Sequence, residues 1–250
     1  MPLLAFLIFP LIAIVVGVSP GQLVVNLANR QVTQAITLSL FTTAATTTIT
    51  VIAGTPVAYI LARRRFAGRN LLDTLIDLPM VLPPAVAGIA LLVAFGRQGL
   101  FGQYLRDIGI TVAFTPVAVV LAQLFVASPF YVKAAAAGFS EISRELEQAA
   151  ALERASPLQV FLAVTVPLAG PALLGGMIMT WARALGEFGA TIIFAGNFPG
   201  RTQTMPLAIY LGFELDLDLA LTLSVILLAI SFVVLFLVKG ALRQRVRAFS

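Results

Sequence analysis

The sequence predicts an all-α membrane protein, a polytopic bundle of about six transmembrane helices with a polar helical loop between two of them. Composition is the first reason: 60% of the 250 residues are hydrophobic and 11% are charged, whereas a soluble domain carries about 25% charged residues. The second reason is the length of the apolar runs, because runs of about 20 residues, the length of a membrane-crossing helix, recur along the whole chain. The third is a single polar interruption at about 138–167.

The apolar runs place six spans, in chain order, at about 3–18, 36–62, 75–95, 112–132, 168–195 and 219–238. The first run could be a signal peptide, but no Lys or Arg precedes it and no clear cleavage site follows it, which favours a span. The stretches 19–35, 96–111 and 196–218 lie between spans and are too short to fold alone. We therefore expect one membrane domain over 1–250.

Several predicted spans contain prolines in their interior, which remove backbone hydrogen bonds and bend or break a helix. They are Pro56, Pro79, Pro83, Pro84, Pro116 and Pro129. Broken helices often line pathways through membranes, while ordinary kinked packing explains any single proline equally well.

The distribution of basic residues predicts the orientation of the chain. A net charge of +5 could indicate nucleic-acid binding, but in a chain this apolar it is more typical of the cytoplasmic ends of spans, and we expect no nucleic-acid partner. With the N-terminus inside, eleven basic residues are cytoplasmic: Arg63, Arg64, Arg65, Arg69, Lys133, Arg144, Arg154, Lys239, Arg243, Arg245 and Arg247. Four are external: Arg30, Arg97, Arg106 and Arg201. This asymmetry predicts a multi-pass protein of the cell membrane (inner or plasma membrane) with both termini in the cytoplasm.

The composition also limits the chemistry. The chain has no Cys and no His, which excludes disulfides, thiol nucleophiles, imidazole bases and most transition-metal sites. A Ser with a Lys base remains conceivable, but Lys133 and Lys239 lie at span ends, so we expect no catalytic residue and no enzyme. The phosphate-binding pattern G-x-x-x-x-G-K-[ST] is absent from the sequence, so no ATP site of that kind is expected.

The polar segment from Ser140 to Pro167 reads as two short helices that meet at a corner. Ile142, Leu146, Ala149 and Ala150 fall on one face at helical spacing. Ser156 followed by Pro157 predicts the start of the second helix, as N-cap and first helical residue. A small helix faced with alanine suits a groove on a soluble partner. The alternative, a helix lying on the bilayer surface, fits less well because its first half is acidic.

The residues of this segment resemble the EAA loop of ABC-type import permeases. The pattern is carried by Glu147, Ala149 and Ala150, then Ala155, Ser156 and Pro157, and finally Val166 and Pro167. Val166 replaces the usual Leu, and Arg154 stands at the corner where the family usually has Gly. A left-handed conformation at that corner would cost about 1 kcal/mol or more with Arg, which leaves open a differently built turn.

The resemblance extends to the stretch that begins DLPMVLPP at Asp77 and to the stretch WARALGEFGA at Trp181, which look like the molybdate and tungstate permeases. Sulfate and thiosulfate permeases share much of both and are the alternative. The resemblance implies a homodimer that imports an oxyanion, two ATP-binding cassette ATPase subunits on the cytoplasmic side, and an extracytoplasmic oxyanion-binding protein. ATP would be bound by the partner subunit, and this chain would need no cofactor. The implied ATPase-docking residues are Glu147, Ala149, Ala150, Arg154, Ala155, Ser156 and Pro157.

Two groups of residues are candidates for the translocation path or its gate. The second span carries hydroxyls on one helical face, including Thr43 and Thr47, which could offer weak hydrogen bonds to a passing anion. The alternative is that these hydroxyls bond their own backbone or tighten helix packing, and that alternative is favoured.

The second group surrounds Arg183 and Glu187, two charges deep in a predicted span whose spacing of four allows them to pair. Arg183 could attract a dianion near a gate, or the pair could be a structural clamp that fixes the span. Gly189 would allow close helix approach or a hinge. An ion-coupled secondary transporter would normally need unpaired carboxylates at mid-membrane, and Glu187 has a partner, so this class is less favoured.

Overall fold

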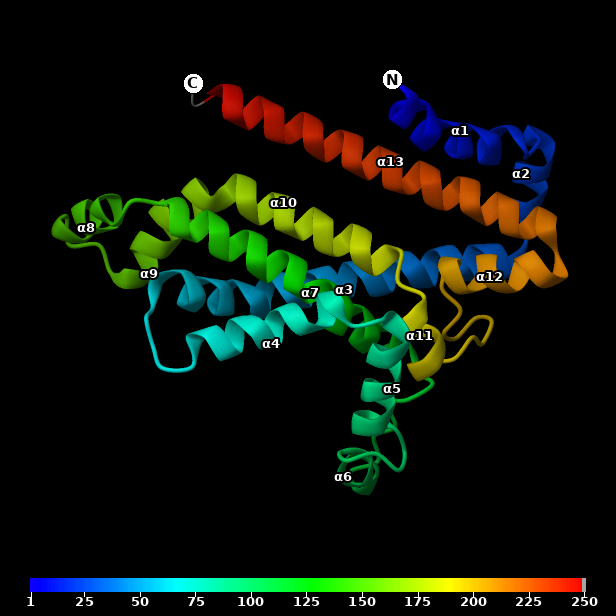
Figure 1. Ribbon diagram of the computed structural model, residues 1–250, viewed down its shortest axis with the longest axis horizontal. Coiled ribbons are helices and arrows are strands. Elements are labelled where there is room, and N and C mark those ends of the chain that lie inside the picture. The colour runs from blue at the N-terminus through cyan, green and yellow to red at the C-terminus, as the bar shows by residue number, and fades with distance from the viewer. Residues whose placement is uncertain (249–250) are drawn as a thin grey trace.

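The computed structural model describes the backbone of residues 1–248 and the side chains of residues 1–238 and 240. As the sequence predicts, the described chain is helical, and it contains no β-strand. Within the described residues, four helices are long and apolar enough to cross a membrane: α3 (Arg30–Arg63), α7 (Pro116–Glu141), the continuous helix Pro157–Leu185, and α13 (Leu217–Ala248) through Val238. These four run along the long axis of the molecule (Figure 1).

Two further pairs of helices each form a bent unit. In the first, α1 (Pro2–Val16) and α2 (Pro20–Leu27) meet at 70°, and in the second, α4 (Arg69–Val81) and α5 (Pro84–Phe95) meet at 116°. Counting each pair once gives the six predicted spans. The third predicted span, 75–95, is nevertheless not one helix. Leu82 is extended, with ψ of 135°, because the residue before a proline is disfavoured in the α conformation, and Pro83 and Pro84 then start a new helix direction.

The connections are more helical than the sequence predicts. The stretches expected between spans contain α2, α6 (Gly102–Asp107) and α12 (Met205–Leu215), and α3 begins at Arg30 rather than at 36. The fifth predicted span, 168–195, is displaced: its helix runs from Pro157 through α9 (Pro157–Val160), a π-helical segment (Phe161–Thr165) and α10 (Val166–Leu185), and a break precedes α11 (Gly189–Phe194). Helices of 6 to 11 residues are too short to cross a bilayer, so a search for apolar runs of span length overlooks them.

Helix α7 lies at the centre, against α3 on one side and α10 on the other. Small residues allow the close contact with α10. A Cβ at Gly138 would collide with the Ala172 Cβ, and one at Gly176 would lie 2.9 Å from the Ala134 Cβ. Close backbone approach at small residues is the usual way in which membrane helices pack, because lipid provides no hydrophobic force between them.

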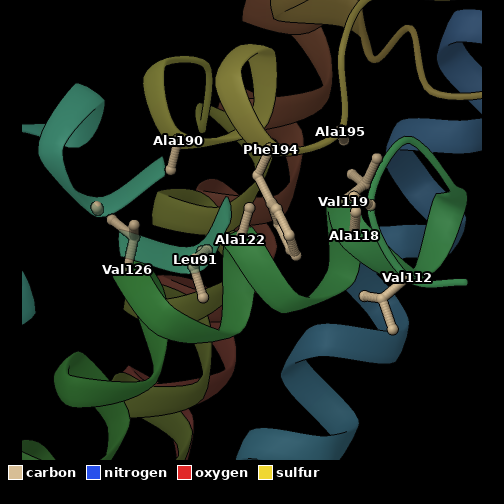
Figure 2. Close-up of a cluster of buried hydrophobic side chains, with 11 residues drawn as sticks. Leu91, Val112, Ala118, Val119, Ala122, Val126, Ala190, Phe194 and Ala195 are labelled. Carbon is tan, nitrogen blue, oxygen red and sulfur yellow. The ribbon is translucent and has the colours of Figure 1, made fainter. Parts of the chain in front are cut away.

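A second packing centre joins the short helices to the bundle. Side chains from α5, the start of α7 and α11 form a buried apolar cluster, of which Leu91, Ala122 and Phe194 are seen in Figure 2. A Cβ at Gly189 would lie 2.6 Å from the Pro84 Cβ, so the start of α11 sits directly on the start of α5. The bent α5 and the short α11 are therefore packed against each other.

The two ends of the bundle differ in composition. The α3–α4 connection, α8 (Arg144–Leu152) and the corner that follows lie at one end (Figure 1), where the sequence places a group of arginines from Arg63 to Arg69. The opposite end holds α2 and the α12–α13 turn. This arrangement agrees with the predicted sidedness, which remains a prediction. The side chains of Lys239, Arg243, Arg245 and Arg247 lie outside the described residues.

Candidate functional site

The polar segment forms the two helices and the corner that the sequence predicts. The Ser143 hydroxyl accepts the Glu145 N–H at 3.2 Å and caps α8. The second helix begins at Pro157, where the Ser156 Oγ accepts the Gln159 N–H at 3.3 Å and the Gln159 Oε1 accepts the Ser156 N–H at 2.7 Å. This reciprocal capping box confirms the helix start predicted from Ser156 and Pro157.

Between the helices, Arg154 has a φ of 62° and is in the left-handed region. The corner is therefore built with the left-handed conformation even though it lacks the usual glycine. A non-glycine residue in this conformation costs about 1 to 2 kcal/mol, which the caps on both sides must offset.

The predicted docking residues differ in exposure. Ala149, Arg154, Ser156 and Pro157 are exposed, while Ala150 and Ala155 are half-buried. The same surface carries the exposed apolar side chains of Leu146, Leu152 and Leu158. The expectation that Ile142 shares a helical face with Leu146, Ala149 and Ala150 is wrong. Ile142 is extended, precedes the start of α8, and is buried in the cluster formed by α3, α7 and α10.

Glu147 lies on the inner side of α8 and is bonded within the chain. Its Oε1 accepts the Arg63 Nη2 at 2.9 Å and the Thr165 hydroxyl at 2.8 Å. The Arg63 and Glu147 side chains are 9% and 16% exposed. Arg63 also donates from Nη1 to the Ile142 carbonyl at 3.0 Å, and Arg144 donates to the Arg63 carbonyl at 3.1 Å. One guanidinium and one carboxylate thus join the end of α3, the end of α7, α8 and the π-helical segment.

Thr165 is brought to Glu147 by the π-helical segment. Here the Val166 N–H donates to the Phe161 carbonyl, five residues back, and Pro167 has no N–H to continue an α-helical ladder. The sequence does not predict Arg63 or Thr165 as site residues. Arg63 is 84 positions from Glu147, and no periodic pattern joins the two.

Arg183 and Glu187 form the pair that their spacing predicts, with the Arg183 Nη1 and the Glu187 Oε2 2.7 Å apart. The pair does not lie within one helix, because α10 ends at Leu185. Instead, the Glu187 Oε1 accepts the Ala190 N–H at 2.8 Å in the first turn of α11. Glu187 is 1% exposed and Arg183 is 29% exposed. The carboxylate therefore holds the end of α10 and the start of α11 together, while part of the Arg183 side chain remains accessible.

The hydroxyls of α3 bond mainly within the protein. Thr43 donates to the Ser39 carbonyl and Thr47 donates to the Thr43 carbonyl, each at 2.7 Å, and both residues are buried. Thr46 donates to the Gln123 Oε1 at 3.0 Å, which joins α3 to α7. This geometry matches the alternative of backbone bonding and helix packing. A role for Thr43 and Thr47 in a pathway stays a prediction.

Lys133 is held between two carboxylates. Its Nζ lies 3.0 Å from the Asp73 Oδ1 and 3.0 Å from the Asp77 Oδ2, both on α4. The ammonium thus joins α7 to α4 and serves as a structural partner. A lysine held in this way is not a free base for a nearby serine.

Comparison with known proteins agrees with this architecture. The family model described as "Binding-protein-dependent transport system inner membrane component" matches residues 54–248. The chain is 42% identical over 231 residues to the molybdenum transport system permease protein ModB of Mycobacterium tuberculosis, covering 92% of this chain and 88% of that protein. It is 36% identical over 234 residues to the sulfate transport system permease protein CysT of Salmonella typhimurium, covering 92% and 84%.

Among solved structures, a bacterial ABC transporter involved in the import of the acidic polysaccharide alginate superimposes with a TM-score of 0.75 at 15% identity, covering 96% of this chain and 91% of that one. At this identity the likeness concerns the fold alone. The family match, by contrast, covers most of the chain and includes both the corner segment and the Arg183–Glu187 pair. The chain therefore belongs to the family of binding-protein-dependent transport system inner membrane components.

Proposed function

We propose that this chain is the membrane-spanning permease of an ATP-driven importer whose substrate is an oxyanion, molybdate or tungstate, with sulfate as the second candidate. The observation that carries the proposal is the 42% identity to the molybdenum permease across 92% of this chain. The sulfate permease is similar over the same share of the chain at 36% identity, which supports sulfate as the alternative.

The permease works as a homodimer with two ATPase subunits on the cytoplasmic side and a binding protein outside. Helix α8 and the corner at Arg154 dock onto the ATPase. Support comes from their exposed surface, where Ala149 and Leu152 lie on the capped helix α8 and Leu158 lies on the capped helix α9. Such a surface fits a groove on a soluble subunit.

The oxyanion passes near Arg183. The Arg183 side chain is partly exposed near the break between α10 and α11, and a cation there attracts a dianion without enclosing it. The buried Glu187 orients the guanidinium and reduces the net positive charge, which favours release of the anion. Gly189 allows the break to pack tightly against α5.

The proposal is tested with the permease reconstituted together with its ATPase and binding protein in proteoliposomes. We expect ATP hydrolysis to rise more with molybdate or tungstate than with sulfate at equal concentration, because the binding protein delivers only its own anion. Phosphate at the same concentration is the control for nonspecific anion effects. A larger response to sulfate would transfer the assignment to the second candidate, and no response to any of these anions would contradict oxyanion import.

A further inference from the structure

The strongest unassigned feature is the buried connection between the docking helix α8 and the membrane-crossing helices. Glu147 belongs to the segment that the family resemblance assigns to ATPase docking, yet its carboxylate faces the inside of the permease. Among the described residues, its Oε1 accepts hydrogen bonds from Arg63 at 2.9 Å and from Thr165 at 2.8 Å. The Glu147 side chain is 16% exposed, so most of it is covered by this chain.

Arg63 is the centre of this connection. It is the last residue of α3, and its two terminal nitrogens reach two different elements, the Ile142 carbonyl at the end of α7 and the Glu147 carboxylate on α8. Arg144 of α8 reaches back to the Arg63 carbonyl, so α3 and α8 are joined twice. Charge-assisted bonds of this kind are the strong ones, and burial removes most of the screening by water.

Helix α3 leads from this connection to the rest of the bundle. It packs against α7, α10 and α12, and its buried Thr face is bonded to α7 through Gln123. A displacement of α8 that keeps the Arg63–Glu147 bond must therefore move the end of α3. Without the bond, the described side chains that join α8 directly to α3 are reduced to Arg144, whose bond to the Arg63 carbonyl is exposed and weaker, so α8 could shift more easily while α3 stays in place.

We propose that Arg63 is a positioning residue for the coupling between the ATPase and transport: through Glu147 it fixes α8 to the end of α3, so that motion of the docked helix is passed to the bundle. This inference rests on the proposed function, because it assumes that α8 contacts the ATPase. It assigns Glu147 to holding the docking helix and leaves the partner contacts to the exposed residues of α8 and the corner.

The first test needs only the purified permease. Because the sequence contains no Cys, a single spin label can be placed on the exposed Gln148 of α8 as Gln148→Cys. We expect Arg63→Ala to make the label clearly more mobile in the electron paramagnetic resonance spectrum. Arg64→Ala is the matched control, since Arg64 is the next residue, carries the same charge, is exposed, and has no side-chain bond in the described part of the chain.

The second test uses the complete transporter in proteoliposomes. We expect Arg63→Ala to keep the ATPase bound but to lower uptake per ATP hydrolysed by about tenfold, within the range of measured coupling between sites. Arg63→Lys should give an uptake per ATP between those of the wild type and Arg63→Ala. The reason is that a single ammonium can bind Glu147 but cannot at the same time donate to the Ile142 carbonyl, as the two terminal nitrogens of arginine do. This variant also keeps the test informative if Arg63→Ala inserts poorly.

Equal label mobility and equal uptake per ATP in Arg63→Ala and Arg64→Ala would overturn the inference. Loss of ATPase binding in Arg63→Ala, with coupling intact in the complexes that remain, would reduce Arg63 to a purely structural role and would also overturn it. Failure of the proposed function is distinguishable: the wild-type complex would then hydrolyse ATP without any response to binding protein and anion, while the label mobility would still decide the role of Arg63.

Discussion

At the scale of single residues, the corner at Arg154 shows how a strained conformation is held in place. Arg154 keeps the left-handed conformation at a φ of 62°, between the cap of α9 on one side and the end of α8 on the other. We expect Arg154→Gly to leave the corner unchanged or to stabilise it by up to about 1 kcal/mol, because glycine adopts this conformation without strain. Arg154→Val should destabilise it, since a β-branched residue tolerates positive φ least.

Hydrogen exchange over residues 144–160 measures the difference. Exchange should be as slow as in the wild type, or slower, in Arg154→Gly, and faster in Arg154→Val. Substitution of the exposed Glu153 by Ala serves as the control for changes of charge near the corner. If the valine variant exchanges like the wild type, the left-handed corner is not a source of strain.

Arg183 and Glu187 can affect transport in two ways, by attracting the anion and by holding α10 and α11 together, and one set of variants tests both. Removing Arg183 leaves the buried Glu187 carboxylate without its cation, and removing Glu187 leaves the partly exposed Arg183 without its carboxylate. Arg183→Met combined with Glu187→Gln removes both charges. The amide oxygen that Glu187→Gln introduces can still accept the Ala190 N–H, which the native carboxylate accepts at 2.8 Å. We therefore expect the double variant to insert and to bind its ATPase normally, yet to take up the anion slowly, because the attraction by Arg183 is lost. Uptake close to that of the wild type, beside two impaired single variants, would assign the pair to structure alone.

Only those features of the candidate site that depend on residues close together in the chain could be predicted from the sequence. The pair at 183 and 187 follows from helical spacing, and the cap at Ser156 follows from local chemistry, so both could be predicted. The bond of Glu187 to Ala190 could not, because the spacing argument assumes an unbroken helix. Arg63 stands out in the sequence only as a basic residue at a span end, since contacts between distant positions leave no pattern in one sequence.

At the scale of elements, the contact between α7 and α10 depends on glycines that have no room for a side chain. Gly176 faces the Ala134 Cβ, where an added Cβ would lie at 2.9 Å, while its neighbour Gly175 has open space. We expect Gly176→Ala to destabilise the permease by about 1 to 3 kcal/mol, the usual effect of overpacking. Gly175→Ala should be neutral or stabilising, since alanine favours a helix more than glycine does.

Thermal unfolding of the purified permease in detergent compares the two variants, with the fluorescence of Trp181, the single tryptophan of the sequence, as the probe. The midpoint should fall only for Gly176→Ala. Equal midpoints for the two variants would show that the helices can separate enough to accept a methyl group, and would contradict tight packing at this contact.

Element boundaries were the least predictable feature. Span length finds α7 and α13, but α7 runs from Pro116 to Glu141, whereas the expected span is about 112–132. The criterion of bilayer length cannot find α12, whose 11 residues are apolar but too few to cross. Prolines mark possible breaks without deciding between them. At Pro83 one helix ends and the next begins in a different direction. Pro56 and Pro129, by contrast, lie inside α3 and α7, and both helices continue past them. Prolines are tolerated inside membrane helices where neighbouring helices satisfy the freed backbone groups.

At the scale of the whole molecule, the proposed orientation gives the last prediction. The α3–α4 connection and the loop before α12 lie at opposite ends of the bundle (Figure 1), so the two must be on opposite sides of the membrane if the long helices cross it. Eleven basic residues against four predict that the first of these connections lies in the cytoplasm. Gln203 is a poor site for an external probe because it is buried, and its Oε1 accepts a bond from Gln31 at 3.1 Å.

Suitable positions are instead Ala67 and Arg201, which are exposed in these two connections. In a chain without its own cysteine, Ala67→Cys should react with a membrane-impermeant maleimide only after the cells are opened, and Arg201→Cys should react in intact cells. Denatured samples of both variants control for the intrinsic reactivity of each thiol. The reverse labelling pattern would show that the chain has the opposite orientation in the membrane. Reaction of both thiols in intact cells would mean that the two connections lie on the same side of the membrane. Helix α8 could then no longer be assigned to the side on which ATP is hydrolysed.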